Sequence, residues 1–386
     1  MILSPALYVH VPYCKSRCAY CDFYSCHKQD AGIPTAQYVK ALTQEMKGRA
    51  REAGAAGSDG GKPGLYSLYF GGGTPSLLSE EEWHMAFEAV HAHFHLPTSA
   101  EQTVELNPDD VTPALARCLK SQGVNRVSLG VQSLDDGTLR LLQRRHDAQQ
   151  AVAAIETLHR TGFDNISADL IYGLPMQTTG AFHKDLLAML RLPITHLSAY
   201  ALSIEPGTLM ARRVESGDWK PADEETSLAM YTDLMDTAAA EGWEHYEISN
   251  FARPGFRSRH NSAYWAQRPY IGLGPSAASY DGRRLRRVNL PDLASYVHAT
   301  LCGHDAPHED ERLSDDELYN EIIMTRMRTR EGLPLHLLSA KDRAELLRSA
   351  EAHLRRGLLV LEDESLRLTR AALFVSDDVL SDLMRC

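Results

Sequence analysis

The chain has 386 residues, of which 44% are hydrophobic and 24% charged, and its formal net charge is −11 at pH 7. This acidic balance argues against broad electrostatic binding to nucleic acid or anionic lipid. No apolar run approaches the about 20 residues of a membrane span, and residues 1–6 lack the features of a secretory signal. The seven cysteines are too few and too unevenly spaced for a disulfide framework, so we expect a cytoplasmic protein without a membrane span.

Strand-like and helix-like segments alternate up to about residue 240. Strands are expected at 7–11, 65–70, 102–106, 126–129, 165–171 and 195–202. Helices are expected at 35–50, from Ser79 onward, and at 113–122, 148–161, 181–190 and 223–241, with a glycine-rich loop at 54–64. Such alternation predicts a parallel sheet covered by helices, and six successive strands favour a barrel over a doubly wound sheet. The sequence therefore predicts an α/β fold with an incomplete (β/α)6 TIM-like barrel.

The pattern changes after about residue 300. Ser314 and Glu317 form a capping box that opens a helix, and a second helix is expected at 340–356. Segments 358–361 and 365–368 read as a hairpin, followed by a last helix. We interpret this region as a C-terminal winged-helix-like α+β domain that acts as a lid or docking unit, because its acidic setting does not favour DNA recognition. The expected division is a partial barrel at 1–240, a connecting region at 241–300 and the C-terminal domain at 301–386.

Three cysteines lie in one short loop with the spacing Cys-x3-Cys-x2-Cys: Cys14, Cys18 and Cys21. Three thiolates on one loop can bind three irons of a cubane cluster and leave the fourth iron open. The interleaved Lys15 and Arg17 are expected to favour the thiolate state. A structural zinc site that takes a fourth ligand from Cys26-His27 is the alternative.

Polar and glycine residues follow the expected strands, where the chemistry of barrels is found. The turn 71–75 is Gly-Gly-Gly-Thr-Pro, and its glycines allow a ligand to approach the backbone. Glu105 closes the third strand, where a carboxylate can accept hydrogen bonds from a ribose diol. Gln132, Arg144 and Asp169 lie at or after the fourth and fifth strands. Taken singly, each of these residues is more simply explained as part of a turn or the surface.

Together, these motifs in this order resemble the radical S-adenosylmethionine superfamily, and more narrowly its branch related to oxygen-independent coproporphyrinogen III oxidase. The resemblance runs from Tyr8 to about residue 280 and resumes in the C-terminal region. It implies a 4Fe-4S cluster held by Cys14, Cys18 and Cys21, whose open iron chelates S-adenosylmethionine. It also implies that Tyr8, Gly72 and Glu105 contact the cluster-bound S-adenosylmethionine. Finally, it implies contacts with its nucleoside, or with a second S-adenosylmethionine, for Gly73, Thr74, Gln132, Arg144 and Asp169.

Two departures distinguish the chain from the oxidases. Phe23 stands where the oxidase pattern has a further cysteine, and only a short arm precedes Cys14. Both departures match the sister branch, the heme chaperones of the HemW type. The segment His260-Asn-Ser-Ala-Tyr264-Trp265 is similar to a motif associated with heme binding in that branch, which implies His260 as an axial ligand beside Tyr264 and Trp265. A hydrogen-bonded core histidine is the alternative.

We therefore expect a heme chaperone that carries a 4Fe-4S cluster and S-adenosylmethionine, binds heme, and transfers it to acceptor hemoproteins, including those of the respiratory chain. An electron donor to the cluster is a further expected partner, and no nucleic acid is expected. Whether radical chemistry turns over stays open. The alternatives are radical decarboxylation of coproporphyrinogen III to protoporphyrinogen IX, and a non-catalytic zinc or iron–sulfur binding module.

Overall fold

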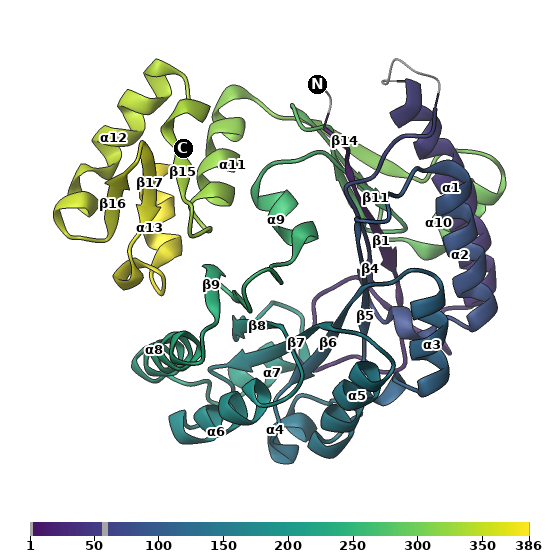
Figure 1. Ribbon diagram of the computed structural model, residues 1–386, viewed down its shortest axis with the longest axis horizontal. Coiled ribbons are helices and arrows are strands. Elements are labelled where there is room, and N and C mark those ends of the chain that lie inside the picture. Colours follow the sequence, from purple (N-terminus) through teal and green to yellow (C-terminus); the bar gives the residue numbers. More distant parts are fainter. Residues whose placement is uncertain (1–2, 56–60, 386) are drawn as a thin grey trace.

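The computed structural model describes residues 3–55 and 61–385 and is built on one sheet of twelve strands in these ranges. Six neighbouring strands are parallel and follow the chain order, and they form the partial TIM-like barrel that the sequence predicts (Figure 1). These strands are β1 (Ala6–Val11), β4 (Ser67–Gly72), β5 (Glu101–Leu106), β6 (Arg126–Gln132), β7 (Asn165–Tyr172) and β8 (His196–Ala201).

The two faces of the barrel strands differ in chemistry because successive side chains on a strand point to opposite sides. Leu7, Val9 and Val11 of β1 are fully buried in the core. The intervening Tyr8 and His10 point into the barrel, where they meet other polar groups. Strands buried on both faces usually carry apolar residues throughout, so the polar inner face indicates a functional interior.

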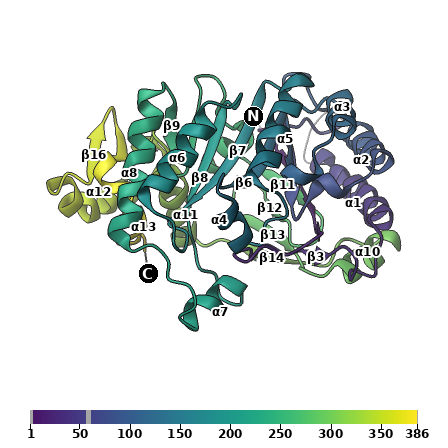
Figure 2. The same ribbon diagram turned by 90° about the horizontal axis from the view of Figure 1, so that it is seen from below.

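Helices cover the outer face of the barrel (Figure 1), and the short helix α7 projects from the body in the view of Figure 2. They are α1 (Thr35–Ala55), α2 (Glu80–His93), α3 (Pro113–Ser121), α4 (Asp136–Leu141), α5 (Ala148–Arg160), α6 (Thr179–Leu190), α7 (Leu209–Glu215) and α8 (Glu224–Ala240). Short 3-10 turns occupy Pro75–Leu77 and Pro108–Asp110. Helix α1 extends past residue 50, so the start of the loop expected at 54–64 is wrong; residues 56–60 of that loop lie outside the described residues.

The sheet continues beyond the six barrel strands on both sides. Strand β11 (Tyr270–Leu273) lies parallel to β1, and antiparallel strands β12 (Ala278–Tyr280), β13 (Leu285–Asn289) and β14 (His308–Arg312) extend that side. On the other side, β10 (Asn250–Ala252) and β9 (Glu244–Glu247) follow β8. Helices α9 (Arg259–Trp265) and α10 (Leu293–Leu301) complete this region. Much of the expected connecting region 241–300 therefore belongs to the main sheet, while the expected domain boundaries remain predictions.

The C-terminal region has a hydrophobic core of its own, formed by α11 (Asp315–Arg326), α12 (Ala340–Arg355), α13 (Ser376–Leu383) and a three-stranded sheet. The sheet consists of β15 (Leu333–Pro334), β17 (Ser365–Leu368) and β16 (Leu359–Glu362), with 3-10 turns at Leu335–Leu337 and Arg370–Ala372. The predicted capping box of Ser314 and Glu317 and the predicted hairpin are both present.

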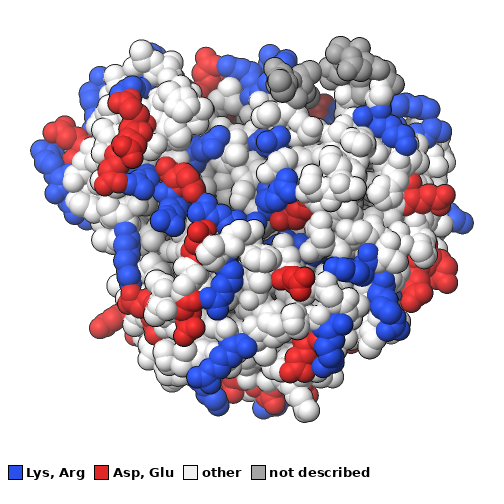
Figure 3. All heavy atoms as spheres, in the orientation of Figure 1, with Lys and Arg blue, Asp and Glu red and all other residues white. Residues whose placement is uncertain are grey.

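Acidic and basic side chains are mixed over the face of the molecule shown in Figure 3. Within 3–55 and 61–385, no helix is long and apolar enough to cross a membrane.

Candidate cluster and cofactor site

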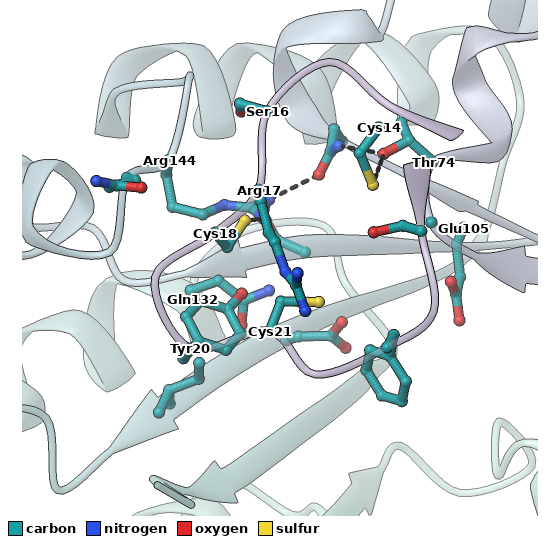
Figure 4. Close-up of a pocket in the computed structure, with 18 of the residues that line it drawn as sticks. Cys14, Ser16, Arg17, Cys18, Tyr20, Cys21, Thr74, Glu105, Gln132 and Arg144 are labelled. Atoms are coloured by element: carbon teal, nitrogen blue, oxygen red, sulfur yellow. Dashed lines mark hydrogen bonds between the residues drawn. The ribbon is translucent and has the colours of Figure 1, made fainter. Parts of the chain in front are cut away.

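The three cysteines line a cavity of about 440 Å³ at the carboxyl ends of the barrel strands (Figure 4). They lie on loop 13–27, whose base is closed by parallel pairing of β2 (Tyr13–Cys14) with β3 (Cys26–His27). At its tip, the amide of Ala19 donates to the carbonyl of Leu142 at 3.0 Å, and the carbonyl of Ala19 accepts from the amide of Met210 at 2.8 Å. These contacts fix the loop at its base and at its tip, and they hold the thiols over the barrel.

A chain of hydrogen bonds connects two of the thiols (Figure 4). The Thr74 hydroxyl lies 3.5 Å from Cys14 Sγ, and Asn107 Nδ2 donates to Thr74 Oγ1 at 3.1 Å. Arg144 donates from Nη2 to Asn107 Oδ1 at 2.7 Å and from Nη1 to Cys18 Sγ at 3.1 Å. Hydrogen-bond donors to sulfur stabilise thiolates and orient metal ligands. These hydrogen bonds are therefore suited to a negatively charged metal centre.

Two residues of the cavity wall, at the ends of β4 and β6, have a positive φ angle. Gly72 has φ +104°, and a Cβ on it would lie 2.5 Å from the His10 ring, so only glycine fits there. The register of β6 with β7 shifts between Leu129 and Gln132, and Gln132 has φ +69°. A non-glycine residue in this left-handed region is strained, and such strain clusters at ligand sites.

Glu105 and Asp169 place two buried carboxyl groups in the cavity wall. Glu105 accepts hydrogen bonds from the Tyr69 hydroxyl at 2.7 Å and from the Gly72 amide at 3.1 Å. Burial raises the pKa of Glu105 to about 7 and the pKa of Asp169 to about 6. Carboxyl groups whose pKa values lie near neutrality are typical of binding and catalytic sites.

The thiols fit an iron–sulfur cluster in number, placement and surroundings. Burial raises the pKa of the Cys21 thiol to about 11, so metal binding must supply the free energy that deprotonates it. Arg144 contacts Cys18, whereas Lys15 forms an ion pair with Asp110. Arg17 lines the cavity together with the three cysteines, and the expectation that Lys15 and Arg17 favour the thiolate state stays a prediction.

The alternative of a zinc site has little support in this geometry. Cys26 and His27 do not line the cavity: Cys26 Sγ lies 3.7 Å from the Tyr24 hydroxyl, and His27 pairs with Asp30. In the described part of the chain, no three His, Cys, Asp or Glu side chains are arranged to hold a single metal ion. A cubane has a different requirement, since each thiolate binds its own iron.

Most of the predicted cofactor residues surround one cavity. The lining includes Cys14, Cys18, Cys21, Gly72, Gly73, Thr74, Glu105, Gln132, Arg144 and Asp169. Tyr8 does not line it; its hydroxyl lies 3.2 Å from His10 Nδ1 inside the barrel.

Sequence reasoning assigned no role to two residues that the structure places next to the site. Asn107 bridges Thr74 and Arg144. His10 Nε2 lies 2.8 Å from the Tyr24 carbonyl and so connects the cysteine loop to β1. Asn107 lies two residues after Glu105, at the end of the predicted third strand, whereas His10 carried no local signal.

His260 contacts Ser67, the first residue of β4, and so lies toward the amino ends of the barrel strands, whereas the cysteine loop lies at their carboxyl ends. It is only 1% exposed, and its ring is 2.8 Å from Ser67 Oγ through Nδ1 and 3.0 Å from the Tyr264 hydroxyl through Nε2. Burial lowers the pKa of His260 to about 3, so the ring is neutral. Trp265, on the same helix, packs beneath the guanidinium of Arg328. Ligation of iron by His260 therefore requires displacement of one of its two hydrogen-bond partners.

A partial barrel with three loop cysteines over a polar cavity is the architecture of a radical S-adenosylmethionine protein. The radical SAM superfamily model matches residues 8–188, and the HemN C-terminal domain model matches residues 313–375. The heme chaperone HemW of Mycobacterium tuberculosis is 36% identical over 382 residues, which cover 98% of this chain and 94% of that protein. The Bacillus subtilis heme chaperone HemW is 33% identical and covers 83% of both chains. The chain belongs to the HemW family.

Solved structures agree with this assignment at the level of the fold. The Escherichia coli coproporphyrinogen III oxidase HemN, described as a radical SAM enzyme, superposes with a TM-score of 0.84 and covers 99% of this chain and 90% of its own. Its sequence identity is 22%, so this likeness concerns the fold alone. Membership of the superfamily implies a 4Fe-4S cluster and S-adenosylmethionine.

Proposed function

We propose that this protein is a heme chaperone, which binds heme and transfers it to acceptor hemoproteins, including those of the respiratory chain. The observation that carries the proposal is the 36% identity with a protein named heme chaperone HemW, which extends over 98% of the chain and so includes both the barrel and the C-terminal region. The cluster and S-adenosylmethionine enable or regulate the transfer, and an electron donor reduces the cluster.

The mouth of the cavity supports a role other than that of the oxidase. Phe23 lines this cavity and is 65% exposed. In the oxidase pattern the corresponding position is a cysteine, so the chain offers an apolar ring where the oxidases offer a thiol. An exposed aromatic side chain favours contact with a flat apolar ligand or a protein surface.

We also propose that the segment from His260 to Trp265 takes part in heme binding. Tyr264 and Trp265 are partly exposed; Tyr264 contacts the buried ring of His260 and the partly exposed ring of Tyr270. Aromatic side chains can cover the macrocycle while a neutral imidazole binds the iron. Because both ring nitrogens of His260 already have partners, heme binding at this point requires displacement of the Ser67 or the Tyr264 hydroxyl.

The test is an anaerobic titration of the cluster-reconstituted protein with hemin. A saturable Soret shift is expected, followed by transfer of the heme to apomyoglobin. His260→Ala is expected to weaken hemin binding at least about tenfold, whereas His304→Ala, at an exposed histidine, leaves it unchanged. If a sample with full cluster iron content shows no saturable Soret shift, the proposal that the protein is a heme chaperone is contradicted. Unchanged binding by a folded His260→Ala variant contradicts only the ligand assignment.

The fold likeness to HemN makes oxidation of coproporphyrinogen the second candidate. Anaerobic incubation of the same sample with coproporphyrinogen III, S-adenosylmethionine and a reductant separates the two functions. A heme chaperone is expected to form no protoporphyrinogen IX. Formation of protoporphyrinogen IX at catalytic rates would contradict the chaperone proposal and show that the protein is a coproporphyrinogen III oxidase.

A further inference from the structure

The linker, residues 326–332, runs from the last residue of α11 to the start of β15, and two of its arginine residues contact helix α9. Nη2 of Arg326 donates a hydrogen bond at 2.9 Å to the carbonyl of Ala266, the residue that caps α9. The guanidinium of Arg328 lies 5.1 Å from the centre of the Trp265 ring. Helix α9 lies between the barrel and the C-terminal unit, and it meets that unit through two cationic side chains (Figure 1).

The fold holds both arginine residues in place. Met327, which lies between them in the sequence, is fully buried in the hydrophobic core of the C-terminal unit. The carbonyl of Arg328 accepts a hydrogen bond from the amide of Ile248 at 3.2 Å, and Thr329 forms a β-bridge with Glu247. Because a core side chain and main-chain groups anchor the linker, its arginine side chains are positioned before any ligand arrives.

Neither guanidinium forms an ion pair. Within residues 3–55 and 61–385, no Asp or Glu oxygen lies within 4.0 Å of Arg326 or Arg328. The neighbouring carboxyl groups are bound to other partners: Glu244 and Glu331 pair with Arg257, Glu321 pairs with Arg286, and Glu101 accepts hydrogen bonds from the amides of Arg259 and His260. The two cations are therefore available to an external anion.

Glu247 is the carboxyl group that faces Arg328 from inside the protein. It is 3% exposed, and its Oε1 accepts hydrogen bonds from the amide of Ser249 at 3.0 Å and from the side chain of Asn250. Its Oε2 is buried without a partner among the described residues. Glu247 thus compensates part of the Arg328 charge through space, but it does not occupy the hydrogen-bond donors of Arg328.

The contact with Trp265 suits Arg328 to bind a carboxylate. Stacking on an aromatic ring uses the face of a guanidinium and leaves the N–H groups in its plane free to donate. In the described part of the chain, Arg328 donates no side-chain hydrogen bond and Arg326 donates only the bond to Ala266. Arginine binds carboxylates through paired N–H groups, so the linker offers two carboxylate-binding groups beside the partly exposed rings of Tyr264 and Trp265.

We propose that Arg326 and Arg328 bind the two carboxylate groups of the porphyrin, while Tyr264 and Trp265 contact its ring. Heme is a flat apolar ring with two propionate groups, so it requires aromatic surface next to positive charge. The net charge of −11 disfavours binding of such a dianion elsewhere on the chain. The inference rests on the proposed heme binding at α9, and it adds the C-terminal unit to that site.

The experiment compares hemin with hemin dimethyl ester, which has the same ring and iron but no carboxylate charge. Soret titrations of the anaerobically reconstituted protein give the ratio of the two Kd values. The unmodified protein is expected to bind hemin at least about tenfold more tightly than the ester. The double variant Arg326→Gln with Arg328→Gln is expected to lose most of this preference, because its affinity for hemin falls while its affinity for the ester stays the same.

The control removes the same charge from exposed positions at the end of α12, by Arg348→Gln together with Arg356→Gln. This control is expected to keep the preference for hemin. Equal weakening of hemin and ester in the Arg326 and Arg328 double variant indicates a packing role and contradicts the proposal. Equal affinity of the unmodified protein for hemin and for the ester contradicts it without any variant.

If the double variant does not fold, the single variants decide. Arg326→Gln keeps a side-chain donor for the Ala266 carbonyl, and Arg328→Gln keeps the main-chain pairing with Ile248. Each single variant is expected to lose about threefold of the preference for hemin. An unchanged preference in both folded single variants overturns the proposal.

Failure of this inference is distinguishable from failure of the chaperone proposal. If hemin binds and the double variant keeps the preference over the ester, only the assignment of Arg326 and Arg328 is contradicted. If the preference depends on the two arginine residues but no heme passes to apomyoglobin, only the chaperone proposal is contradicted. Absence of binding by either porphyrin contradicts both.

Discussion

Glu105 is the residue at which burial has the clearest consequence for pH. Burial raises its pKa in the folded protein from 4.5 to about 7. The folded cofactor-free protein therefore holds this proton more tightly than the unfolded chain does. This contribution to stability is complete below about pH 4.5 and is lost as the pH rises through about 7.

Glu105→Gln is accordingly expected to remove this pH dependence. Between pH 5 and pH 8, the unfolding free energy of the cofactor-free variant should fall by about 2.5 kcal/mol less than that of the unmodified protein. Chemical denaturation at the two pH values measures the difference. Glu88→Gln, at an exposed position on α2, is the matched control. Equal pH slopes for the Glu105→Gln variant and the unmodified protein contradict the prediction.

Side-chain chemistry at the site was predictable in kind and not in detail. The spacing of Cys14, Cys18 and Cys21 identified the thiols because local sequence sets their separation. The cation that donates a hydrogen bond to Cys18 is Arg144, more than a hundred residues further along the chain, whereas the adjacent Lys15 pairs with Asp110. The fold of the barrel decides which distant cation reaches a thiol, and the spacing of neighbouring residues in the sequence does not contain this information.

Among elements, long strands and helices were easier to predict than short ones. All six parallel barrel strands were found from runs of buried apolar residues. Strands β9 to β12 are three or four residues long, too short for alternation to be visible. Helix α9 was missed as a helix because only its His260 and Ala263 are buried, which leaves no apolar stripe.

The cysteine loop is coupled to β4 and β5 through Asn107. Its side chain joins Thr74, which contacts Cys14, to Arg144, which contacts Cys18. Asn107→Ala removes both bonds and is expected to weaken iron retention by about 10- to 100-fold, as is usual for the outer partners of metal ligands.

Iron and sulfide content after anaerobic reconstitution and stepwise chelation measures the effect of Asn107→Ala. The control variant is Gln149→Ala, at an exposed residue of α5. If Asn107→Ala retains iron as well as this control does, the hydrogen-bond chain has no part in holding the cluster.

At the scale of the molecule, the C-terminal unit is attached to the barrel through a short backbone segment. The amide of Arg330 donates to the Tyr246 carbonyl at 3.0 Å, and Ile248 donates to the Arg328 carbonyl at 3.2 Å. Thr329 and Glu247 form an isolated β-bridge. Main-chain pairing of this kind orients the C-terminal unit beside α9, which carries His260.

Replacement of Arg330 by proline tests this attachment, because proline lacks the amide hydrogen. Arg330→Pro is expected to loosen the C-terminal unit and to accelerate limited proteolysis near residues 326–333. Arg330→Ala keeps the amide and should behave like the unmodified protein. Equal cleavage rates for Arg330→Pro and Arg330→Ala would show that the backbone pairing does not hold the C-terminal unit.

The closed base of loop 13–27 has a consequence for which contacts position the thiols. The pairing of β2 with β3 and the backbone hydrogen bonds of Ala19 use main-chain groups and no cysteine side chain. In small zinc-dependent domains, by contrast, metal binding itself supplies the free energy of folding. The course of this loop therefore has main-chain support in addition to the bonds that its thiolates form with metal.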